Sequence, residues 1–211
     1  MKLKIMLAVV AMFASITNAS YAARGTDGNV SIVYWQAPSI LNPYLSSGTK
    51  DIESASLVIE PLGRYTETGA LVPFLAKEIP TVANGGVSPD LTSITWTLQE
   101  GLLWSDGTPV TSADVKFSAD YCMHPEGGCS QLAKFDGIKS ISIPDDLTIV
   151  VTFEGPMPNP YGPFMGGQTP IIQKAQFENC LGPKAQQCTE QNFNPIGTGP
   201  FVVTEFRPND V

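Results

Sequence analysis

The chain has 211 residues, of which 43% are hydrophobic and 15% charged, with 18 prolines and 19 glycines. This composition is sufficient for a hydrophobic core and indicates many turns, so we expect a globular, strand-rich protein. The formal net charge of -8 argues against nucleic acids and anionic membranes as partners, because both bind basic surfaces.

Residues 1–22 have the features of a secretory signal peptide. Lys2 and Lys4 precede ten apolar residues, and Ser20-Tyr21-Ala22 offers the small residues of a cleavage site. The apolar run is too short for a membrane span, which needs about 20 residues. The alternative is a buried N-terminal helix. We favour export to the periplasm with cleavage after Ala22, which removes two lysines and changes the net charge from -8 to -10.

The first predicted element is a strand over residues 29–35, in which Val30, Ile32 and Tyr34 alternate with their neighbours. A loop with the sequence ILNPY follows at residues 40–44. From Asp51 the apolar residues change to helical spacing, and Pro61 marks the expected end of that helix.

Two hairpins are predicted in the middle of the chain. The first joins residues 94–98 to residues 102–104, and the second joins residues 141–143 to residues 147–153, where the alternation is clearest. Between them, Thr111 is expected to cap a helix that has Asp114 as its third residue.

The last third of the chain is punctuated by proline and glycine. Residues 155–163 are expected to form an irregular connection, Thr169-Pro170 a helix start, and residues 201–206 a strand.

The four cysteines lie in two close pairs, Cys122 with Cys129 and Cys180 with Cys188. Four cysteines allow three connectivities, and we favour local pairing, since export makes disulfides plausible. A zinc site formed by all four thiolates is the competing interpretation, but neither pair has CxxC spacing and His124 is the only histidine. We therefore expect no metal site and no cofactor.

Three ordered segments resemble a known family, the peptide, dipeptide and nickel-type solute-binding proteins of ABC importers (family 5). They are the ILNPY loop with its following helix and Glu60-Pro61-Leu62, the sequence GLLWSDGTPVTSADVKFS at residues 101–118, and NPIGTGPF at residues 194–201. The second segment is the most specific. In the first, Asn42 stands where aspartate is usual.

The resemblance implies an α/β fold with two lobes, of which this chain holds only part of the first. We expect residues 23–64 to begin the main sheet of lobe I, residues 65–193 to form its small subdomain, and residues 194–211 to return to the main sheet. Members of the family are usually more than twice as long, so we expect a truncated sequence that lacks lobe II.

The function implied by the resemblance is a periplasmic binding protein that catalyses no reaction. It would capture peptides and deliver them to a membrane permease, and we expect it to be monomeric. By match of position, Ser47, Gly48 and Thr49 would contact the main chain of the peptide, although a serine replaces an acidic residue that can hold the ligand's amino group. A flexible loop without ligand contacts is the alternative. Trp35 is a further candidate, since it ends the first predicted strand.

Three other functions remain open, one of which is a structural or chaperone-like module with no affinity for small molecules. A relative with the same fold could carry a nickel chelate, haem or a sugar. An exported hydrolase would need a nucleophile and a base within reach, but the chain has no GxSxG or HExxH motif.

Overall fold

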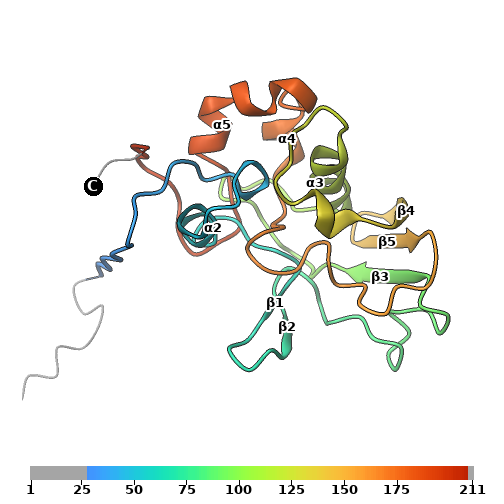
Figure 1. Cartoon of the computed structure of the whole chain (residues 1–211). Coiled ribbons are helices and arrows are strands. Elements are labelled where there is room, and N and C mark those ends of the chain that lie inside the picture. Colours follow the sequence, from blue (N-terminus) through green and yellow to red (C-terminus); the bar gives the residue numbers. More distant parts are fainter. Residues whose placement is uncertain (1–27, 209–211) are drawn as a thin grey trace, which may run out of the picture. The chain divides into compact units, whose positions relative to one another are not determined.

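Antiparallel strands and short helices make up the computed structural model, which describes residues 28–208 (Figure 1). The chain divides into two units, Met1–Tyr34 and Trp35–Val211. The predicted signal peptide lies outside the described residues. Within residues 28–208, no helix combines the length and apolarity that crossing a membrane requires.

A three-stranded sheet has the strand order β3-β5-β4 (Figure 1). Its strands are β3 (Ser93–Thr97), β4 (Ile138–Asp145) and β5 (Thr148–Phe153), and both pairings are antiparallel. The β4–β5 pairing confirms the second predicted hairpin. Ile149 and Val151 of β5 lie opposite Trp96 and Ile94 of β3, and all four side chains are buried. Alternation with a period of two therefore places one apolar face of this sheet in the core.

The first predicted hairpin is wrong. β3 pairs with β5, while residues 102–104 fold back on residues 108–110 through bonds from Trp104 N to Thr108 O and from Val110 N to Leu102 O. The tight turn at Asp106-Gly107, where Gly107 has a φ of +84°, brings these two segments together. Residues 102–104, which the sequence pattern had assigned to β3 as its partner, therefore pair across this local turn instead.

The longest helix among residues 28–208 is α3 (Ser112–Met123), and it begins as predicted. The Asp114 carboxylate accepts hydrogen bonds from the backbone and hydroxyl of Thr111, completing a capping box. Val115, Ala119 and Cys122 are fully buried, and the helix packs against β4 and β5.

The remaining elements are short. They are η1 (Pro43–Leu45), α2 (Thr49–Ala55), β1 (Gly63–Tyr65), β2 (Leu71–Pro73), η2 (Leu132–Phe135), α4 (Lys174–Phe177), η3 (Gly182–Gln187) and α5 (Thr189–Phe193). β1 and β2 form a separate antiparallel pair. The predicted helix after residue 51 is α2, which ends at Ala55 rather than near Pro61, and the helix expected at Thr169 begins only at Lys174.

Two predicted strands are absent from the described part of the chain. Residues 29–35 and residues 201–206 form no strand, because neither segment has a ladder partner among residues 28–208. Val33 is 94% exposed and Trp35 77%, so their apolar side chains are not buried within the described units. Phe201 makes one backbone bond to Leu57, and the pairing stops there.

Both disulfides are local. Cys122 is bonded to Cys129 with an S–S distance of 1.98 Å, and Cys180 to Cys188 with 2.08 Å. The favoured connectivity is therefore the one in the structure, and it leaves no free thiol for a four-cysteine zinc site. Among the described residues, no three His, Cys, Asp or Glu side chains gather as a metal site would require.

Candidate functional site

Of the predicted ligand residues, Ser47 and Gly48 lie between η1 and α2, and Thr49 is the first residue of α2. Ser47 and Thr49 are exposed, and the partly exposed Gly48 is the N-cap of α2. Within the described part of the chain, the side chains of Ser47 and Thr49 form no hydrogen bond with another residue. We call residues 47–49 the ligand loop. Trp35 is exposed, and no hydrogen bond or ring contact joins it to this loop within residues 35–208.

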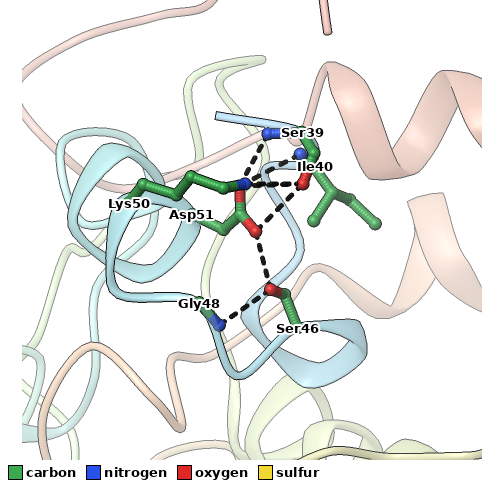
Figure 2. A network of polar contacts seen from close by, with 6 residues as sticks. All are labelled: Ser39, Ile40, Ser46, Gly48, Lys50 and Asp51. Atoms are coloured by element: carbon green, nitrogen blue, oxygen red, sulfur yellow. Dashed lines mark hydrogen bonds and ion pairs between the residues drawn. The ribbon is translucent and has the colours of Figure 1, made fainter. Parts of the chain in front are cut away.

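A buried carboxylate organises the polar contacts next to the ligand loop (Figure 2). Asp51 is only 2% exposed. Its Oδ1 accepts bonds from the backbone of Ser39 at 2.6 Å and from Lys50 Nζ at 2.8 Å, and its Oδ2 accepts one from Ser46 Oγ at 2.7 Å. The Ser39 hydroxyl and the Ile40 N–H also donate to this carboxylate. Both carboxylate oxygens are thus occupied by groups of the chain itself.

The charge of Asp51 is balanced by its neighbour in the sequence. Burial alone would raise the pKa of the Asp51 carboxyl, but the bonds from Lys50, Ser46 and Ser39 outweigh burial and lower the pKa. The carboxylate is therefore ionised at neutral pH. Lys50 Nζ also donates to Ser39 Oγ at 2.8 Å, so the buried ammonium has two partners.

Ser46 connects this network to the ligand loop. Its hydroxyl donates to Asp51 and accepts from the backbone N–H of Gly48 at 3.0 Å. The Ser46 hydroxyl thus links the residue before Ser47 to the residue after it, and this link limits the conformations of the ligand loop.

The segment that leads into the ligand loop is anchored through Asn42 and Tyr44. Asn42 Oδ1 accepts from the backbone of Tyr44, and Asn42 Nδ2 donates to Tyr121 Oη at 3.1 Å and to Asn192 Oδ1 at 2.8 Å. Tyr44 Oη donates to Pro170 O at 2.6 Å. Asn42 and Tyr44 are buried. An aspartate at position 42 would lack the amide that donates to Asn192, so this departure from the family pattern fits the local contacts.

The most specific motif, at residues 101–118, has structural contacts throughout. Asp106 Oδ1 accepts from the backbone and hydroxyl of Thr108, and its Oδ2 accepts from Gln173 Nε2 at 2.8 Å. Trp104 is buried in the core. These contacts connect the turn to the residues that precede α4.

No sequence pattern predicted a role for Ser39, Ser46, Lys50 or Asp51. A Lys-Asp pair at the start of a helix usually lies on a solvated face, and Ser39 is 12 residues from Asp51. The useful signal is the cluster of small hydroxyl residues around the loop, whose oxygen atoms are suited to bonding a carboxylate.

Comparison with known proteins extends over most of the chain. The family described as bacterial extracellular solute-binding proteins, family 5 Middle, matches residues 70–211, about two thirds of the chain. Protein XP55 of Streptomyces lividans is 32% identical over 183 residues, covering 85% of this chain and 31% of its own length. A Brucella ovis protein named as an ABC transporter peptide-binding protein is 29% identical over 122 residues, which cover 57% of this chain and 22% of that protein.

Solved structures match the fold as well. The binding protein AgaA of A. tumefaciens R10, in complex with agropinic acid, has a TM-score of 0.68 and 27% identity, and the match covers 82% of this chain and 32% of that one. Haemophilus influenzae OppA, in complex with the peptide RPPGFSPFR, also has a TM-score of 0.68, with 19% identity and coverage of 83% and 35%. The α/β structure thus corresponds to part of the periplasmic-binding-protein fold, and the chain spans about a third of the length of these proteins. The chain belongs to the bacterial extracellular solute-binding proteins of family 5.

Proposed function

We propose that the full-length protein is the solute-binding component of an ABC importer, that its ligands are peptides, and that it delivers them to a membrane permease. Support comes from the family and from the relatives, since the Brucella ovis protein is named for peptide binding and OppA holds a nonapeptide. The proposal includes export by residues 1–22, a monomeric state and the division of lobe I at residues 64 and 193.

The observation that carries the proposal is the contrast between the exposed loop and the buried groups around it. Ser47 and Thr49 present free hydroxyls to solvent, while Ser46 and Asp51 hold their neighbouring backbone in place. Such a loop suits an extended peptide, whose main chain is recognised by backbone and hydroxyl groups. Since ordering a loop on binding costs free energy, a loop that is already held favours affinity.

The ligand's amino group is not expected to bind Asp51. That carboxylate is buried and already accepts bonds from Ser39, Ser46 and Lys50. We therefore assign to this loop recognition of the peptide main chain rather than of its terminal charge.

A second ligand class follows from AgaA, which holds agropinic acid. Its identity to this chain is higher than that of OppA. Small acids therefore belong in the same screen, together with nickel chelates, haem and sugars.

The test is calorimetry and thermal shift with the full-length exported protein, against peptides of two to nine residues and these other solutes. We expect at least one peptide to raise the melting temperature. Ser47→Trp should weaken its binding about tenfold or more, because a bulky ring on the loop occupies space that the ligand needs. Glu67→Trp, on the exposed turn between β1 and β2, is the matched control and should bind normally. Peptides without effect, or normal binding by Ser47→Trp, would contradict the proposal.

A further inference from the structure

We infer that Gln131 is a positioning residue for the ligand loop. It lies 85 residues from Ser46 in the sequence and is 6% exposed. Its single amide group donates to two backbone carbonyls of the segment that enters the loop, Pro43 O at 3.2 Å and Ser46 O at 2.9 Å. For its consequence in ligand binding, this inference rests on the proposed function.

The two carbonyls belong to Pro43, the first residue of η1, and to Ser46, its C-cap residue. Pro43 O also accepts from the backbone N–H of Ser46 at 3.4 Å. The carbonyl at the end of a helix lacks a partner within the helix and needs a donor from elsewhere. Gln131 supplies both donors from one planar group, so Pro43 and Ser46 are held at a fixed separation. Ser46 is thereby fixed through its carbonyl by Gln131 and through its hydroxyl by Asp51.

Gln131 is itself attached to rigid parts of the fold. Cys129, two residues earlier, is bonded to Cys122 of α3, and the backbone N–H of Gln131 donates to Cys129 Sγ at 3.4 Å. Between them, Ser130 N donates to Tyr44 O at 2.7 Å. The segment that carries the amide is therefore attached both to α3 and to Tyr44.

The residues after Gln131 enter the core. Phe135, at the end of η2, is 3% exposed, and its ring lies 6.4 Å from the Tyr44 ring and 5.8 Å from the Phe164 ring. The loop entry, the disulfide-bonded segment and the core thus form one connected unit, in which Gln131 makes the side-chain hydrogen bonds to Pro43 and Ser46.

Gln131→Glu tests this role because it keeps the shape and removes the donors. An ionised carboxylate cannot donate to Pro43 O and Ser46 O, whereas a protonated carboxyl donates one bond. Burial beside two carbonyl oxygens raises the pKa of the introduced group, so lowering the pH from 8 to about 5.5 should restore part of the contact. Tyr44, whose pKa burial raises, and Asp51, whose pKa is lowered, keep their charge states over this range.

The first measurement needs no ligand. We expect Gln131→Glu at pH 8 to speed amide hydrogen exchange in residues 44–49 by about tenfold, as for one lost buried hydrogen bond, with partial recovery at pH 5.5 after correction for intrinsic rates. Gln99→Glu is the matched control, since Gln99 Nε2 also donates to two backbone carbonyls, those of Phe74 and Ala76. Unchanged exchange in residues 44–49, or the same change in the control, would overturn the inference. If Gln131→Glu fails to fold, Gln131→Met gives the same comparison without the pH arm.

The second measurement is the affinity for tri-alanine at both pH values. We expect Gln131→Glu to bind about tenfold more weakly than the unmutated protein at pH 8 and to recover partly at pH 5.5. Altered exchange with unaltered affinity would refute the role in binding. If the unmutated protein binds no peptide, the proposed function fails, while the exchange experiment still decides whether Gln131 holds the loop.

Discussion

Replacing Asp51 with asparagine tests whether the buried network stabilises this part of the fold. The side chain of Asp51 is 3% exposed and that of Lys50 10%, with Nζ and Oδ1 2.8 Å apart. Asp51→Asn leaves the ammonium without its counter-ion. It also puts an amide donor near the N–H of Ser39 or the hydroxyl of Ser46, which now donate to the carboxylate.

The expected cost follows from these contacts. Removing one partner of a buried ion pair destabilises by about 3–5 kcal/mol. Asparagine retains one acceptor oxygen, and the Lys50 side chain is not fully enclosed. We therefore expect Asp51→Asn to lower the free energy of unfolding by about 2–4 kcal/mol.

The assay is equilibrium unfolding in urea at pH 7. Asp120→Asn is the matched control, because it breaks the exposed pair Lys116–Asp120, whose side chains are 37% and 46% exposed, and it should cost less than about 1 kcal/mol. Lys50→Met combined with Asp51→Asn should recover about 1 kcal/mol by removing the unpaired charge. Equal losses for Asp51→Asn and Asp120→Asn would refute this account of the network.

Three further predictions concern pH, a disulfide and a close backbone contact. The pKa of Asp51 in the folded state lies below its unfolded value of 3.8, so its contribution to stability is complete above about pH 4 and is lost as the pH falls through the folded pKa. When unfolding is measured from pH 6 to 2.5, the free energy of unfolding of Asp51→Asn should therefore fall less than that of the unmutated protein. Parallel curves for the two proteins would contradict this. Replacing Cys180 and Cys188 by serine should cost about 2–3 kcal/mol by the chain-entropy argument, measured by the same unfolding assay, and no loss would show that the closed loop contributes nothing. Gly197→Ala should reduce the melting temperature strongly, because a Cβ there would lie 1.9 Å from Val58 O. Gly155→Ala is the control and should be neutral, since a Cβ at that position meets no atom within 4 Å. Equal melting temperatures for the two variants would refute the contact.

Local patterns predicted the elements whose partners are near in the sequence. The alternation in residues 147–153 predicted β5 because one face of that strand is in the core, and Thr111 with Asp114 predicted the start of α3 because both groups of a capping box lie within one turn. β3 was recognised as a strand but given the wrong partner, since alternation shows which face is buried and not which strand lies alongside.

The candidate site was only partly predictable for the same reason. Ser47, Gly48 and Thr49 were selected by their positions after Asn42-Pro43, whereas several of the groups that hold the adjoining segment come from distant parts of the sequence. Gln131 reaches Ser46 across 85 residues, and Asn192 reaches Asn42 across 150. No spacing rule connects such positions, because the contacts depend on where the tertiary fold places α5 and the disulfide-bonded segment.

The hydrogen bonds around the ligand loop hold its backbone in place and leave two of its hydroxyl groups exposed to solvent. Asn42, Ser46 and Asp51 direct their polar atoms inward to other groups of the chain, so the backbone on either side of residue 47 is fixed. The hydroxyls of Ser47 and Thr49 have no such partners within the described residues and face solvent. Because these contacts are present in the folded chain, little further ordering of the loop would be required for the peptide binding proposed above. A mutation that loosens Ser46 should therefore weaken binding without touching any atom that contacts the ligand, and this is the reason that Gln131, buried and remote in sequence, is expected to influence affinity.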